Sequence, residues 1–155
     1  MAFILSGLDP VEFQDVLRRS DADLQANGMR RMRVDKVGSF PCRVSLEDAP
    51  LGEEVILLPY VHQPTDSPYR ASGPIFVRPA ARAPVRIVDA IPPYLSTRLL
   101  SVRAYNSRDE IIDAEVVPGD TAEATFHRLL ANEAAAYLHV HFARYGCYGC
   151  RVDRH

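Results

Sequence analysis

The stretch Arg98–Val117, RLLSVRAYNSRDEIIDAEVV, decides the fold class. Polar and apolar residues alternate over Arg98–Tyr105 and again over Ile111–Val117, the period of half-buried β-strands. The polar residues Asn106–Asp109 between them favour a turn, so the stretch predicts an antiparallel hairpin. The core side of the second strand is expected to be Ile112, Ala114 and Val116.

The segment after this hairpin predicts a helix and a second hairpin. Asp120–Glu123 reads as a capping box that opens a helix ending near Ala135. Two further strands are expected at Tyr137–Ala143 and Tyr148–Val152, joined at Gly146. The residues before Arg98 predict two short helices, which span 10–19 and 20–27. They also predict strands at 29–34, 41–46, 55–58, 75–77 and 85–88, and a loop at 62–74.

These elements do not alternate strictly between helix and strand. We therefore expect an α+β fold with a mostly antiparallel sheet of about seven or eight short strands and two or three helices. A length of 155 residues suits one domain over residues 1–155.

Composition excludes several classes of function. The 18 basic residues are balanced by 20 acidic ones, so no overall positive charge points to nucleic acid. No apolar stretch approaches the roughly 20 residues that cross a bilayer, and the first residues lack the basic segment of a secretory signal. We expect a cytoplasmic protein without membrane or nucleic-acid partners, whose three cysteines are reduced or bind a metal.

His139-Val140-His141 is the clearest chemical motif, because alternation on a strand places both imidazoles on one face. With Cys147 they could hold zinc, whereas Cys150 would lie on the opposite face of a regular strand. A second interpretation makes Cys147 a nucleophile assisted by a histidine. A third leaves the histidines solvated and the cysteine in the core.

The stretch His62–Pro74, HQPTDSPYRASGP, is the other candidate, because ordered loops of this length are often functional. The Arg70 guanidinium suits a carboxylate or phosphate, and Ser72 could complete the anion site. An internal salt bridge made by Arg70 is the alternative.

Three long stretches of the chain resemble the bacterial domain-of-unknown-function family 1203. They are Pro41–Arg78, Arg98–Val117 and Tyr137–Arg154, and the family has no established activity. The resemblance implies that the candidate residues are those in the family's recurrent motifs, namely Cys42, His62, Gln63, Ser67, Tyr69, Arg70, Ser72, His141, Cys147 and Arg151. The family pattern does not require a cysteine at Cys150, which weakens a four-ligand zinc site. It often has Asn where Phe142 stands, which implies that a polar contact near His141 is absent or replaced in this chain.

Together these residues predict a cleft between the 62–74 loop and the C-terminal hairpin that binds or processes a small anionic molecule. The ligand-binding residues would be Gln63, Ser67, Tyr69, Arg70, Ser72 and Arg151, and the catalytic residues His141, Cys147 and His62. The alternatives are a non-catalytic module with a structural zinc at His139, His141 and Cys147, or a homodimer with the histidines at its interface.

Overall fold

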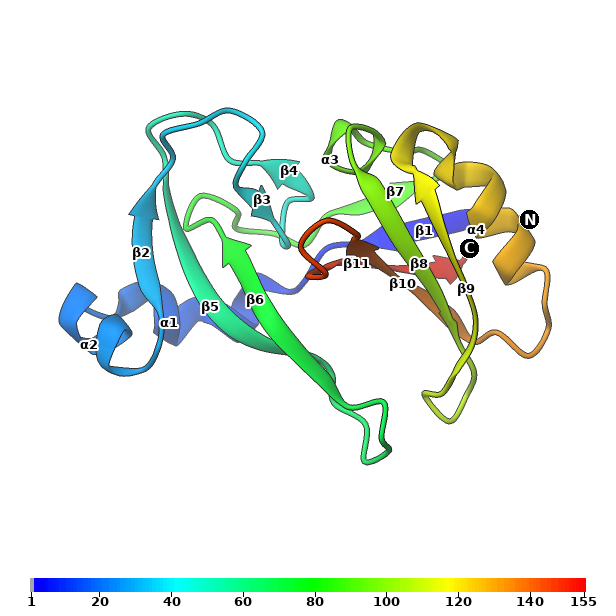
Figure 1. The fold of residues 1–155 in the computed structure, drawn as a ribbon. Helices are drawn as coiled ribbons and strands as arrows, with labels where there is room; N and C mark the ends of the chain where they lie inside the picture. The colour runs from blue at the N-terminus through cyan, green and yellow to red at the C-terminus, as the bar shows by residue number, and fades with distance from the viewer. Residues whose placement is uncertain (1) are drawn as a thin grey trace.

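A computed structural model describes residues 2–155 and contains two β-sheets that lie side by side (Figure 1). One sheet has six strands and the other five, and four α-helices and two short 3-10 helices pack around them in this part of the chain. The expected α+β class is confirmed. The expectation of about seven or eight strands in one sheet is corrected to eleven strands in two sheets.

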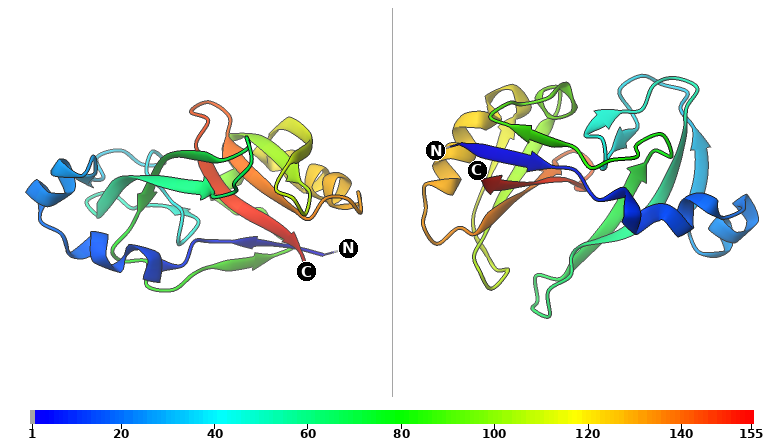
Figure 2. Two further views of the ribbon diagram at one scale, coloured as in Figure 1. Left: turned by 90° about the horizontal axis from the view of Figure 1, so that it is seen from below. Right: turned by 180° about the vertical axis from the view of Figure 1, so that it is seen from behind.

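The six-stranded sheet contains both ends of the chain and is antiparallel throughout. Its strands, in spatial order, are β7 (Arg86–Val88), β1 (Phe3–Ser6), β11 (Tyr148–Arg154), β10 (Tyr137–Phe142), β8 (Leu99–Tyr105) and β9 (Ile111–Pro118). The short helix α3 (Pro93–Ser96) precedes β8, and a 3-10 turn (Gly119–Thr121) leads into α4 (Ala122–Leu130). Figure 2 shows the first and last strands adjacent in the sheet.

Helix α4 packs across one face of this sheet. Phe126, Leu129 and Leu130 have the spacing of one helical face and are almost fully buried. They contact the inward residues of β8, β10 and β11, among them Val102 and Leu138. The opposite face of the sheet is therefore left for other contacts, and it looks towards the second sheet (Figure 1).

The five-stranded sheet has one parallel pair, between β3 and β6, and is otherwise antiparallel. Its strands, in spatial order, are β2 (Arg30–Arg33), β5 (Glu54–Gln63), β6 (Ala71–Val77), β3 (Pro41–Cys42) and β4 (Glu47–Asp48). A 3-10 turn (Pro10–Phe13), α1 (Gln14–Arg18) and α2 (Asp21–Ala26) accompany it. Phe13 and Leu24 pack against Ile56 and Leu58 of β5 to form its core.

Several element boundaries differ from expectation for clear physical reasons. Strand β1 was not predicted, because its four residues are too few to show a period. Strand β5 continues through Pro59 to Gln63, so the 62–74 loop shrinks to the tip that joins β5 to β6. The helix expected from Asp120 to Ala135 begins with the 3-10 turn and ends at Leu130.

The expected core side of β9 is wrong. Ile112 and Val116 are 38% and 61% exposed, on the side of the sheet away from α4. Asp113 and Glu115 instead face the helix, where both form ion pairs with Arg128. Alternation identifies the two faces of a strand but not which face its neighbours cover.

Candidate functional site

The face of the six-stranded sheet away from α4 carries a row of polar and aromatic side chains. His139 of β10 lies opposite Arg103 of β8 on one side and Arg151 of β11 on the other. Two residues before His139 on β10, Tyr137 lies opposite Tyr105. Because residues two apart point to the same face of a strand, these side chains all share one surface.

A β-bulge adds Tyr148 to this surface. Val140 pairs with Cys150 and His141 with Tyr148, so β11 has one extra residue, Gly149, between the two pairs. The bulge lets Tyr148 share the face of His141 although Cys150, two residues later, is buried in the core under α4. A side chain at Gly149 would meet the carbonyl oxygen of Val140 at 3.1 Å, which explains why glycine occupies the bulge.

His62, near the end of β5, completes a group of three imidazoles that we call the histidine cluster: His62, His139 and His141. The ring centre of His62 lies 4.9 Å from that of His141 and 6.1 Å from that of His139. Its ring stacks on Tyr148, with centres 5.4 Å apart and an interplanar angle of 10°. The end of β5 and the C-terminal hairpin therefore meet in space.

Gln63, the neighbour of His62, fixes this contact with hydrogen bonds. Its side-chain amide donates to the Tyr137 hydroxyl at 2.8 Å, and that hydroxyl donates to the Asp109 carboxylate at 2.6 Å. Gln63 is 3% exposed, so the amide is held by the network and does not face solvent. Burial raises the pKa of Tyr137 to about 12, so the hydroxyl keeps its proton.

The ring nitrogens of the cluster differ in their partners. His141 donates from Nδ1 to the Gly146 carbonyl at 3.0 Å, so in the neutral ring Nε2 carries the lone pair. That Nε2 lies 3.5 Å from an Arg103 N–H, which can donate to it. Both ring nitrogens of His62 and Nδ1 of His139 are buried and have no hydrogen-bond partner among residues 2–155. Unpaired buried polar atoms are rare in folded proteins and call for an explanation.

Burial keeps the three imidazoles neutral. It lowers the pKa of His139 to about 3 and that of His141 to about 4, and positive neighbours add to the effect. The pKa of His62 is also lowered, by burial first and then by Arg103. Neutral imidazoles each offer one N–H donor and one lone pair.

Arg103 is the charged group common to all three histidines. Its positive charge contributes to the lowered pKa of His62, His139 and His141. Its guanidinium donates to Ser101 Oγ at 3.3 Å but forms no ion pair with any carboxylate in the described chain. Arg151, by contrast, pairs with Asp153 at 2.7 Å and lies 3.9 Å from the centre of the Tyr137 ring.

The proposed zinc ligands are not brought together. Cys147 packs against the core cluster that contains Phe142, and its carbonyl accepts from the Phe142 N–H. Within residues 2–155, no group of three His, Cys, Asp or Glu side chains has the geometry to hold a metal ion. Both ring nitrogens of His141 are also engaged, which leaves only His62 and His139 with free nitrogens.

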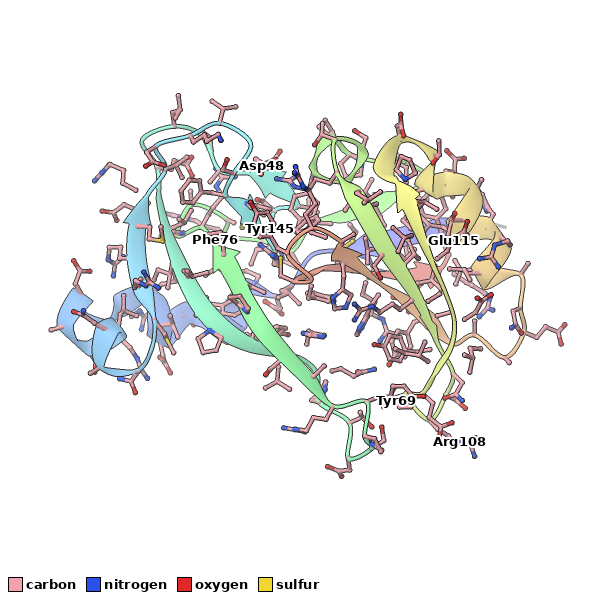
Figure 3. The ribbon with its side chains drawn as sticks, in the orientation of Figure 1. Asp48, Tyr69, Phe76, Arg108, Glu115 and Tyr145 are labelled. Carbon is pink, nitrogen blue, oxygen red and sulfur yellow. The ribbon has the colours of Figure 1, made fainter. Side chains whose placement is uncertain are left out.

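The loop residues expected to bind an anion lie away from the cluster or point to solvent. Arg70 is exposed, and its nearest polar contact is the Thr65 carbonyl at 3.4 Å; no ion pair to it forms in the described residues. Ser67 accepts from the Tyr69 N–H within the loop, and Ser72 is exposed at the start of β6. Tyr69 reaches towards the tip of the β8–β9 hairpin, where Arg108 lies (Figure 3).

Sequence reasoning missed Arg103 and Tyr105. Both alternate with core residues on β8, and such positions usually face solvent. The sequence indicates that Arg103 lies on the polar face of its strand, as His139 does on its own. It does not indicate that the two strands are neighbours or which residues are paired. Arg103, unlike Arg70, lies beside the imidazoles.

Comparison with known proteins places the chain in a family. The family model described as "Protein of unknown function (DUF1203)" matches residues 39–154. The chain belongs to the DUF1203 family. The match covers β3 to β11 and therefore every residue of the histidine cluster, as the sequence resemblance implied. No curated protein and no solved structure matches the chain. Among the helices of residues 2–155, none combines the length and the apolar character that a membrane span requires.

Proposed function

We propose that this DUF1203 protein binds a small anionic molecule at the histidine cluster, with Arg103 as the group that carries the positive charge. The observation behind the proposal is the combination of an arginine without a carboxylate partner and three buried ring nitrogens without hydrogen-bond partners within residues 2–155. An anion beside Arg103 would supply the missing charge, and its oxygens would accept from imidazole N–H groups.

Arg103 and the imidazoles could bind an anion as hydrogen-bond donors from partly buried positions. The Arg103 guanidinium forms charge-assisted hydrogen bonds that are roughly twice as strong as neutral ones. His62 and His139 stand edge to face with ring centres 6.1 Å apart, so an anion would bind beside the pair, or between the rings only if they separate. Tyr148 and Tyr105 add flat aromatic surface around the imidazoles.

Electrostatics favours an anion over a metal cation at this position. Arg103 lowers the pKa of every imidazole in the cluster, and the same positive charge would repel a bound cation. His141 uses one nitrogen on the Gly146 carbonyl and the other on Arg103. A zinc ion on His141 Nε2 would require the Arg103 contact to be given up.

Nuclear magnetic resonance of the histidine rings tests the proposal. Inorganic phosphate, sulfate and acetate are titrated into the protein, and the ring signals of the cluster are followed against pH. A bound anion should raise the pKa of all three histidines, because it offsets the charge of Arg103. Arg103→Gln should weaken binding by roughly tenfold or more, the loss expected for one hydrogen bond to a charged group.

Arg70→Gln is the matched control, because it removes the same charge from the exposed loop and should leave the anion affinity unchanged. Zinc chloride forms a separate arm of the experiment. Zinc that binds stoichiometrically, shifts the same three rings and is indifferent to Arg103→Gln would replace the anion proposal with a metal site. Equal loss of anion binding in both arginine variants would contradict a specific role for Arg103.

A further inference from the structure

A large cavity lies between the two sheets, apart from the histidine cluster. It has a volume of about 1190 Å³ and is bounded by the 36–39 loop, β6 and the turn between β10 and β11. Asp48, Phe76 and Tyr145 mark its margins from three different segments of the chain (Figure 3). The volume exceeds that of most small-molecule sites, which range from roughly 300 to 1,000 Å³.

The charges around this cavity are mostly positive. Its lining contains four basic residues, Lys36, Arg43, Arg98 and Arg144, and one acidic residue, Asp48. Asp48 is already engaged, since both its carboxylate oxygens accept from Arg98, at 2.6 and 3.0 Å. Three basic side chains of the lining therefore have no ion pair within the described part of the protein.

Arg43 is the decisive member of this set. It is 1% exposed, and no carboxylate of residues 2–155 pairs with it. Its guanidinium donates to the backbone carbonyls of Tyr148, at 2.7 Å, and Pro41. It also lies 5.1 Å from the centre of the Phe142 ring. Burying an arginine without a counter-charge is costly, and such a group attracts an anion strongly because little water screens it.

Most of the other residues that line the cavity are apolar. Leu57, Pro74 and Phe76 form one wall on the five-stranded sheet, and Phe142 faces them from the six-stranded sheet. Arg98 covers the Phe142 ring at 4.9 Å, so this ring has guanidinium groups of two arginines against it. A ligand in the cavity would therefore meet both basic groups and hydrocarbon walls.

We propose that this cavity is a binding site for a small amphiphilic anion, a molecule that carries one carboxylate or phosphate on an apolar body. Arg43 and Arg144 bind the charged group, and Leu57, Pro74 and Phe76 cover the apolar part. This site is separate from the histidine cluster and does not depend on the function proposed there. Tyr148 contacts both regions: its backbone carbonyl accepts a hydrogen bond from Arg43, and its ring stacks on His62.

Cys147 provides a reporter for occupancy, because it lines the cavity. The other two cysteines, Cys42 and Cys150, are fully buried. The rate at which neutral iodoacetamide alkylates Cys147 is measured by mass spectrometry in the presence of decanoate, decyl phosphate or decanol, the two anions below their critical micelle concentrations and decanol below its solubility. Decanoate or decyl phosphate should slow the reaction about tenfold, and decanol should do so only at a concentration about tenfold higher.

The two anions separate the carboxylate and phosphate sources of the charge. Protection by either of them supports the site, and the stronger one identifies the headgroup. Equal protection by decanol at the same concentration would show an apolar cavity without anion recognition and would overturn the proposal. Absence of protection by all three would overturn it as well.

Variants assign the effect to the basic residues. Arg43→Met should raise the half-protecting concentration of the anions about tenfold without changing that of decanol. If Arg43→Met does not fold, the double variant Lys36→Gln/Arg144→Gln tests the same charge from the rim of the cavity. Arg108→Gln, at the tip of the β8–β9 hairpin, is the charge-matched control and should have no effect. An equal effect in the control would refute the assignment.

Discussion

Acid should destabilise this protein because His139 and His141 are buried as neutral groups. In the unfolded chain both have a pKa near 6.5, whereas burial lowers their pKa to about 3 and about 4 in the folded protein. Below pH 6.5 the unfolded state therefore binds protons that the folded state does not. The stability contributed by the neutral pair is complete above this pH and is lost as the pH falls towards 4.

The expected size of this effect is large for one pair of side chains. Each histidine contributes a slope of up to about 1.4 kcal/mol per pH unit between its unfolded and folded pKa. Between pH 7 and pH 5 the pair should lower the free energy of unfolding by nearly 4 kcal/mol, a substantial part of the roughly 5–15 kcal/mol typical of small proteins. Both side chains are at most 3% exposed, so solvent screening does little to reduce the effect.

Urea unfolding at pH 7 and pH 5 measures this loss. The double variant His139→Gln/His141→Gln removes both groups and should lose at most about half as much over the same interval, the remainder coming from His62, whose pKa burial also lowers. His127→Gln replaces a surface histidine near Glu123 and serves as the control that should behave like the unmodified protein. A double variant that loses as much stability as the unmodified protein would refute the assignment of acid sensitivity to this pair.

Two further predictions concern backbone packing and the end of α4. A Cβ at Gly119 would lie 1.9 Å from the Leu95 carbonyl oxygen. Gly119→Ala should therefore lower the free energy of unfolding, measured with urea, by about 2 kcal/mol or more. A loss below about 0.5 kcal/mol would contradict this close approach. Arg154 donates four hydrogen bonds to three backbone carbonyls at and after the end of α4. Arg154→Met should therefore speed hydrogen exchange in the last turn of α4 more than elsewhere, and uniform exchange would argue against this role.

The sequence was sufficient to predict most of the local elements. Alternation predicts the β8–β9 and β10–β11 hairpins, and the first helices begin next to Asp9 and Ser20, whose side chains accept backbone hydrogen bonds as N-caps. These features depend on residues close in the chain, so one sequence carries them. The division into two sheets depends on pairings between distant strands, such as β1 with β11, which no local period reveals.

The same limit applies to the candidate site. The sequence shows that His139 and His141 share one face, because they are two residues apart on the same strand. The contact with His62 followed only from the expectation that two segments converge. Neither Arg103 nor Arg70 pairs with a carboxylate in the described residues, and only Arg103 lies beside the imidazoles, a placement that depends on tertiary structure alone.

The placement of β1 between β7 and β11 has a consequence for how the chain is made. Phe3, Ile4 and Leu5 are synthesised well before their partner strand β11. During translation this apolar stretch can pair only with β7 until β11 has left the ribosome. The six-stranded sheet therefore closes late, and until then the nascent chain exposes an apolar segment of the kind that molecular chaperones bind.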